Sequence, residues 1–188
     1  YRQLAIAMAP RSDLQPFCFQ RPGEVAKQCF VRPRGRDLPS TSDVAAGMAA
    51  GTLAWLAADP RIYSLTTHTA SVTLNIGDSS GELVINNAGD FVTDPIITIT
   101  GAGTNPRIEN ADDSAQVIRF DLTQPSGQAL VFDLGKRTAM LNGTSIYSAR
   151  RTDNQWWDLQ PGNNTITYSR TSTAASQTFT VAWQDAWI

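Results

Sequence analysis

The stretch Ala129-Leu-Val-Phe-Asp-Leu-Gly-Lys-Arg-Thr-Ala-Met-Leu-Asn-Gly-Thr-Ser145 decides the fold. Residues 129–134 and 138–141 follow a period of two and are rich in β-prone side chains, which is typical of strands with one buried face. Asn142-Gly143 follows at once and favours a type I′ hairpin turn, because both central positions of that turn need a positive φ. The stretch therefore predicts antiparallel strands joined by tight turns.

The same pattern continues through residues 69–188, where Gly, Asn, Asp and Pro separate short β-prone runs. A spacing of about 8 to 12 residues between runs is typical of a β-sandwich or barrel, so we predict an all-β, two-sheet sandwich without a required helix. The runs are 71–76, 82–86, 96–100, 116–122, 129–134, 138–141, 145–148, 155–159, 165–170 and 178–183. The predicted inward side chains are Val72, Leu74, Ile76, Val117, Leu130, Phe132, Leu134, Ile166, Tyr168, Phe179, Val181 and Trp183.

The composition excludes several classes of protein. A chain with five Trp, seven Phe and a net charge of -2 has enough apolar residues and too little charge to be disordered. Its 15 basic and 17 acidic residues lack the basic excess of a nucleic-acid binder, and no apolar stretch approaches the roughly 20 residues that span a bilayer. We therefore predict no nucleic-acid or membrane partner. Residue 1 is Tyr, which indicates a processed or partial polypeptide.

The first 63 residues predict a separate β region, with a boundary near Ser64 after the turn-forming Asp59-Pro60. A hairpin is expected around residues 21–24, with Gly23 at positive φ. If Gly23 and Glu24 are its central residues, Cys18 lies opposite Cys29, and these two residues are either a cross-strand disulfide or two packed thiols.

Residues 32–39 contain two prolines and a glycine, so they predict a loop or an edge strand. Arg32, Arg34 and Arg36 alternate along this segment. They either bind an acidic partner or are solvated charges that protect an exposed strand edge.

The sequence contains no convincing catalytic or metal-binding constellation. His68 is the single histidine and no Gly-x-Ser-x-Gly motif occurs, which leaves little basis for a Ser-His-Asp triad. Asp121 with Asp133 could form a glycosidase pair, and Asp112-Asp113 could bind calcium or be a solvated loop. We predict that the chain is not an enzyme and holds no cofactor or metal.

Trp156-Trp157 is the candidate contact site for a carbohydrate or a partner protein. On a strand the two rings face opposite sides, so one can enter the core while the other stays outside. An exposed ring is a platform for sugars or proteins. The alternative is that both rings pack within the domain.

Four motifs in order resemble the C-terminal domain of siphophage distal tail (Dit-type) and related minor tail proteins. They are 100–110, Leu130-Val-Phe-Asp133, Met140-Leu-Asn-Gly143 and 156–166. Residues 36–39 and 58–64 resemble the end of that family's N-terminal domain and its junction, so the resemblance covers roughly residues 16–188.

This resemblance implies a galectin-like sandwich over residues 64–188, preceded by part of a ring-forming split-barrel domain over residues 1–63. It implies a structural virion protein of the tail tip, assembled in the host cytoplasm as a homohexameric hub that contacts the tail tube protein and tip proteins. The candidate ring-interface residues are Phe17, Phe19, Phe30, Val31, Trp55, Arg32, Arg34 and Arg36. The alternative function is a carbohydrate-binding module for host-receptor attachment.

Overall fold

The computed structural model describes residues 12–37, 51–114 and 116–188. Contacts divide the chain into an N-terminal unit, Tyr1–Leu65, and a C-terminal unit, Thr66–Ile188. The regular elements of the described residues are strands and one short 3-10 helix, η1 (Tyr147–Ala149). None of the described residues form a helix long and apolar enough to cross a membrane.

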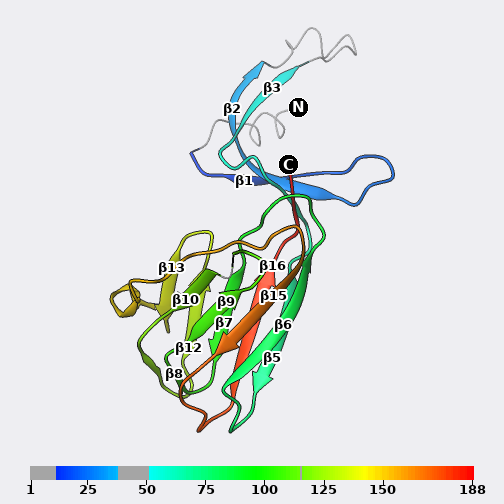
Figure 1. The fold of residues 1–188 in the computed structure, drawn as a ribbon. Helices are drawn as coiled ribbons and strands as arrows, with labels where there is room; N and C mark the ends of the chain where they lie inside the picture. The colour runs from blue at the N-terminus through cyan, green and yellow to red at the C-terminus, as the bar shows by residue number, and fades with distance from the viewer. Residues whose placement is uncertain (1–11, 38–50, 115) are drawn as a thin grey trace. The chain divides into compact units, whose positions relative to one another are not determined.

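The N-terminal unit is an antiparallel sheet built around the long strand β2 (Lys27–Asp37) (Figure 1). Three further strands pair with β2, and they are β1 (Gln15–Phe19), β3 (Thr52–Ala57) and β4 (Ile62–Ser64). The part of the predicted segment up to Asp37 is therefore not a loop but the second part of β2, and residues 38 and 39 lie outside the described residues. Its pairing with β3 shifts register between Pro33 and Gly35, which is how a strand accommodates residues that disturb the ladder.

The β1–β2 hairpin turns where expected but in a different register. The Glu24 amide donates to the Arg21 carbonyl at 3.0 Å, and Gly23 has a φ of 83°. The strands pair Phe17 with Cys29 and Cys18 with Gln28, one residue away from the predicted register. Directly opposite residues share a face and strand neighbours alternate, so Cys18 lies on the face of Gln28 while Cys29 lies on the other face. Both thiols are free, so the disulfide alternative is wrong, but Cys18 is exposed and not packed as predicted.

The C-terminal unit is a sandwich of two antiparallel sheets, which confirms the predicted fold (Figure 1). The first sheet has the order β14-β13-β12-β7-β16-β5 and the second the order β10-β9-β15-β6, while β8 and β11 form a short ribbon. The strands are β5 (His68–Leu74), β6 (Ser80–Asn87), β7 (Ile96–Thr100), β8 (Gly103–Thr104), β9 (Arg107–Asn110), β10 (Gln116–Arg119), β11 (Thr123–Gln124), β12 (Ala129–Asp133), β13 (Thr138–Leu141), β14 (Thr144–Ser145), β15 (Gly162–Ser169), β16 (Gln177–Trp183) and β17 (Ala186–Trp187).

Residues 129–145 form the predicted antiparallel strands and tight turn. β12 pairs with β13, and Leu141 lies opposite Thr144 across the Asn142-Gly143 turn. Asn142 and Gly143 have φ values of 47° and 82°, which are the two positive angles of a type I′ turn.

The core lies between the two sheets, and most predicted inward side chains are in it. The buried ones are Leu74, Leu130, Phe132, Leu134, Ile166, Tyr168, Phe179, Val181 and Trp183, with Val72 packed against them. Ile76 is instead 71% exposed, because β5 ends at Leu74 and Ile76 lies in the following turn. Val117 was also wrongly placed, since Ile118 and Phe120 are the buried residues of that segment.

Two predicted runs are not strands. Residues 155–159 contain a single bridge, between Leu159 and Thr93, and residues 145–148 pass from the end of β14 into η1. The prediction also missed β9, which pairs with both β10 and β15 and so completes the second sheet.

A buried asparagine holds the loop before β15. Asn164 is fully buried, and its side chain donates to the carbonyls of Gln160 and Gly162 at 2.8 and 3.0 Å. Its Oδ1 accepts from the Gln160 amide at 2.8 Å and from Asn110 Nδ2 at 3.2 Å. Its exposed neighbour Asn163 makes one side-chain bond, to Asn86. The Asn164 side chain thus supplies hydrogen-bond partners for the backbone groups of this turn.

Asn164→Ala should destabilise the chain by about 2–4 kcal/mol, because it leaves several buried polar groups without partners. The matched variant Asn163→Ala should cost about 0.5 kcal/mol, since its site is exposed. Urea unfolding monitored by Trp fluorescence measures both. Equal losses for the two variants would contradict the role assigned to Asn164.

A second buried network surrounds Tyr168. Its ring stacks on Phe179 with centroids 5.0 Å apart, and its hydroxyl donates to Gln177 Oε1 at 2.6 Å. Gln177 Nε2 in turn donates to Gln124 Oε1 at 3.2 Å. Burial is the main cause that raises the pKa of Tyr168 to about 12, because it disfavours the phenolate.

Stability should therefore fall as the pH rises from about 10 to about 12. The unfolded chain releases the Tyr168 proton near pH 10, whereas the folded chain retains it up to about pH 12. The free energy of unfolding should therefore decrease by on the order of 2 kcal/mol across this range. Denaturant unfolding at pH 9 to 12 measures the slope. Tyr168→Phe should be less stable at neutral pH but lose less stability across this range, and an unchanged slope would contradict the assignment.

Candidate functional site

The single histidine, His68, contacts an aspartate and a tryptophan that connect neighbouring strands. His68 Nε2 lies 3.2 Å from Asp185 Oδ2, and its ring lies over Trp183 with centroids 5.5 Å apart. Trp183 donates from Nε1 to the Asn86 carbonyl at 3.1 Å, and Asp185 accepts from the Ala88 amide at the same distance. These contacts tie the start of β5 to the end of β16 and to the loop after β6.

The aspartates singled out from the sequence have separate partners. Asp121 pairs with Arg151 at 3.4 Å, and Asp133 pairs with Lys136 at 2.6 Å. Asp112 and Asp113 are not simply solvated, because their carboxylates accept backbone amides of Thr165 at 2.6 Å and Asp158 at 3.2 Å. Across the described ranges, no three His, Cys, Asp or Glu side chains gather as a metal site would require.

The two tryptophans differ in exposure, but not because they alternate on a strand. Trp157 is 1% exposed and belongs to the core, whereas Trp156 is half-buried and packs against the core. Trp157 cannot offer a ring face to a sugar in this structure, which corrects its assignment as a contact residue. Trp156 keeps part of its surface and remains a candidate by prediction.

Residues 149–155, here called the strap, explain this arrangement. The strap runs beside β10, with the Arg151 amide donating to Arg119 at 3.2 Å and the Gln155 amide to Val117 at 2.9 Å. The side chain of Asn154 accepts from the Arg119 amide. The strap therefore covers the outer edge of the second sheet, as exposed strand edges require, and directs Trp157 into the core.

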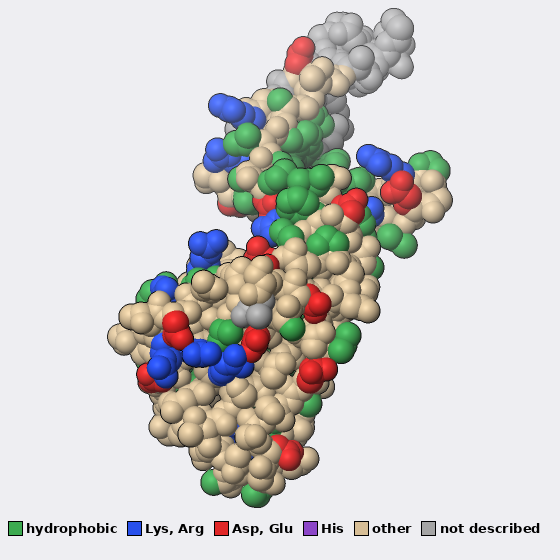
Figure 2. Space-filling model, viewed as in Figure 1, with side chains coloured by type: hydrophobic (Ala, Val, Ile, Leu, Met, Phe, Trp, Pro, Cys, Tyr) green, Lys and Arg blue, Asp and Glu red, His purple; other side chains and the backbone are tan. Residues whose placement is uncertain are grey.

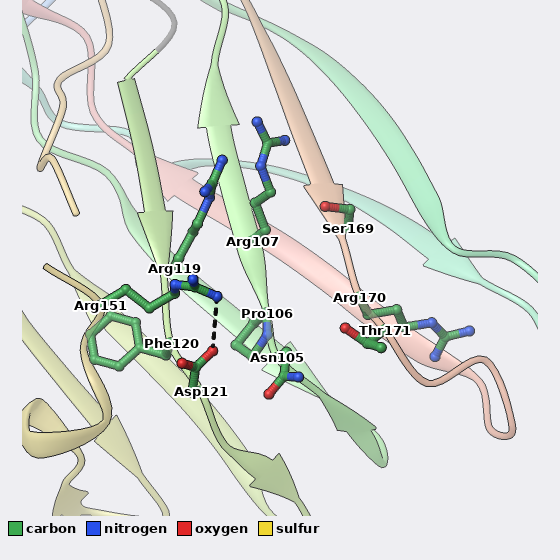
Figure 3. Close-up of a pocket in the computed structure, with 10 residues that line it drawn as sticks. All are labelled: Asn105, Pro106, Arg107, Arg119, Phe120, Asp121, Arg151, Ser169, Arg170 and Thr171. Carbon is green, nitrogen blue, oxygen red and sulfur yellow. Dashed lines mark hydrogen bonds and ion pairs between the residues drawn. The ribbon is translucent and has the colours of Figure 1, made fainter. Parts of the chain in front are cut away.

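Beside the strap lies a polar groove of about 270 Å³ (Figure 3). The sequence analysis did not predict this groove. A signal for it was present, because an inward Val117 would also have placed Arg119 and Asp121 in the core, which argues for the opposite phase of this strand. The residues that line it come from β9, β10, the strap, the end of β15 and the adjoining loops, and they are Asn105, Pro106, Arg107, Arg119, Phe120, Asp121, Arg151, Ser169, Arg170 and Thr171.

The candidate ring-interface residues lie in two groups within the N-terminal unit. Phe17 is 41% exposed, and its ring centroid lies 5.2 Å from that of Trp55 and 6.2 Å from that of Phe19. Phe30 pairs with Pro16 and therefore faces the opposite side from Phe17, where it contacts Tyr63 edge-on with centroids 6.0 Å apart. The aromatic cluster of Phe17, Phe19 and Trp55 is thus partly open to solvent.

The remaining candidate ring-interface residues lie along β2. Val31 is buried, Arg34 is exposed, and Arg32 donates to the Ser12 carbonyl at 3.5 Å. The backbone of Arg36 pairs with Leu53, while its side chain lies outside the described parts.

Replacing the two tryptophans separates a core role from a contact role. Trp157→Ala should destabilise the chain by about 3–5 kcal/mol, since it opens a large cavity in the core. Trp156→Ala should cost about 1–2 kcal/mol because only part of its ring is buried. Guanidinium unfolding measures both losses, and a Trp157→Ala variant as stable as Trp156→Ala would contradict the burial described above.

The chain matches one family model, described as the C-terminal domain of siphovirus-type tail components, over residues 88–187. Among solved structures it is similar to the Dit protein of phage SPP1, with a TM-score of 0.70 at 17% sequence identity. That match covers 100% of this chain and 70% of the SPP1 protein, which is described as a paradigm of the hub adsorption apparatus in phages that infect Gram-positive bacteria. No curated protein matches the chain.

Proposed function

Because the chain belongs to the siphovirus-type tail component family, we propose that it is a structural protein of the phage tail tip. In this role it is a distal tail hub that links the tail tube protein to tip proteins involved in host recognition. The observation that carries the proposal is the family match across most of the C-terminal sandwich, together with a Dit-like fold over the whole chain. Such a protein is assembled in the host cytoplasm and then resides in the virion.

The N-terminal unit supplies the surface for self-assembly in this proposal. We propose that residues 1–63 contribute to a ring-forming domain and that residues 64–188 form the attached sandwich domain. The cluster of Phe17, Phe19 and Trp55 in the N-terminal unit is partly exposed. A permanent ring buries more than about 2,000 Å² per interface, with an apolar centre, and this cluster suits such a centre.

The sandwich unit suits a structural role without catalysis. Its two sheets share a continuous buried core, and its candidate carboxylates are engaged in separate ion pairs or backbone bonds. The carbohydrate-binding alternative has less support, because Trp157 is buried and only Trp156 keeps exposed surface.

Native mass spectrometry of the purified chain at micromolar concentration tests the ring. We expect the mass of six copies, and we expect Phe17→Asp to shift the population to smaller species because it places a charge in the apolar interface. Arg34→Glu provides a second variant on the same unit.

Ile76→Asp is the matched control, because Ile76 is 71% exposed in the sandwich unit. It should leave the assembly unchanged. A monomeric unmodified chain, or a hexamer that survives both Phe17→Asp and Arg34→Glu, would contradict the proposal. Circular dichroism confirms that each variant is folded.

A further inference from the structure

The register of the second sheet places two arginines side by side. Arg119 of β10 lies directly opposite Arg107 of β9, which in turn lies opposite Ser169 of β15. The next row, Ile118 and Ile108, is buried, so both arginines project from the outer face of the sheet. Like charges in directly opposite positions repel each other, and an anion beside them relieves that repulsion.

A third guanidinium reaches the same place from the strap. Arg107, Arg119 and Arg151 all line the groove, with Arg107 and Arg119 extending from neighbouring strands in the same direction (Figure 3). Figure 2 shows Lys and Arg side chains gathered on this part of the C-terminal unit, with Asp and Glu beside them. Arginine side chains are a usual means of binding anionic oxygens in proteins.

Acidic residues already pair with each of these three arginines. Arg119 contacts Asp153 at 2.8 Å, Arg107 contacts Glu109, and Arg151 contacts Asp121 at 3.4 Å. The side chains of Asp153 and Asp121 are 51% and 60% exposed, whereas that of Glu109 is 23% exposed. Exposed ion pairs are weak, so a competing anion can displace Asp153 and Asp121 more readily than Glu109.

The wall of the groove contains a permanent positive charge. Arg170 is 5% exposed and donates to the carbonyls of Asp78, Ala175 and Asn75 at 3.1, 2.5 and 2.8 Å. These partners are neutral, so they hold the guanidinium without cancelling its charge. Four arginines and Asp121 line the groove, and Glu109 and Asp153 contact two of these arginines from beside it. The charge of Arg170 therefore remains without a carboxylate partner among these side chains, and its field favours an anion.

One donor in the groove lacks an acceptor. Arg119 Nε is buried and has no hydrogen-bond partner within the part of the chain that the structure describes. Ser169, Thr171 and Asn105 add neutral polar groups to the lining. A tetrahedral oxyanion offers several acceptor oxygens in different directions, which suits donors on three sides better than a planar carboxylate does.

We propose that this groove is a binding site for a phosphoryl group, as free phosphate or as a phosphate ester. Arg107, Arg119 and Arg151 bind its oxygens, and Arg170 contributes the long-range attraction. Asp121 and Asp153 are internal competitors that hold the arginines in place when the site is free. The proposal rests on the sandwich unit alone and is independent of ring assembly.

Isothermal titration of the full chain with inorganic phosphate at pH 7.5 tests the site, with dimethyl phosphate and acetate as parallel probes at equal ionic strength. We expect saturable phosphate binding that weakens as salt is added. Arg119→Gln and Arg107→Gln should each weaken it about tenfold or more, since each removes charge-assisted hydrogen bonds. Dimethyl phosphate binding would indicate a diester ligand, and its absence would indicate a free phosphate or monoester.

Two further variants separate binding from structure. Arg137→Gln removes an equal charge from the exposed loop between β12 and β13 and should leave phosphate affinity unchanged. Asp153→Asn should strengthen binding several-fold because it removes a competitor, an effect that a purely structural role would not produce. The proposal is overturned if phosphate does not bind, if Arg137→Gln and Arg119→Gln behave alike, if Asp153→Asn weakens binding, or if acetate binds as tightly as phosphate.

Discussion

Burial of the inward side chains of β15 against those of β16 is the interaction on which the sandwich depends. Ile166 and Tyr168 come from one sheet and Phe179 and Val181 from the other, and all four are almost completely buried. Because strand side chains alternate between faces, this packing fixes the register of every strand that pairs with β15 or β16. The outward faces are then free to vary, and the arginine groove lies on one of them.

The polar side chains buried in the sandwich serve its structure. Polar side chains in the core make hydrogen bonds. Asn164 bonds to the backbone of the loop before β15, and Gln177 bonds to the side chains of Tyr168 and Gln124. Buried polar groups satisfied in this way favour one packing arrangement over the alternatives. The exposed features are an aromatic cluster on the N-terminal unit and a cationic groove on the sandwich, two surfaces of different chemistry on separate units.

The failed predictions all concern strand pairing and register, some over long and some over short separations in the sequence. Residues 155–159 read as a strand because they are rich in apolar residues, yet the strap before them covers the edge of β10 and only Leu159 forms a bridge. The inward assignment of Val117 ignored that the same phase would bury Arg119 and Asp121. The Cys18 and Cys29 interpretation depended on a turn centre that local residues left uncertain by one position.

The amino-acid sequence alone determined the all-β class, the Asn142-Gly143 turn, most of the core positions and the family resemblance, because these depend on period, local φ preferences and short motifs. Only the tertiary structure decided the burial of Trp157, the opposite faces of the two cysteines and the meeting of Arg107, Arg119 and Arg151. Those features depend on the register of strand pairing, in which a shift of one residue moves a side chain from one face of a sheet to the other.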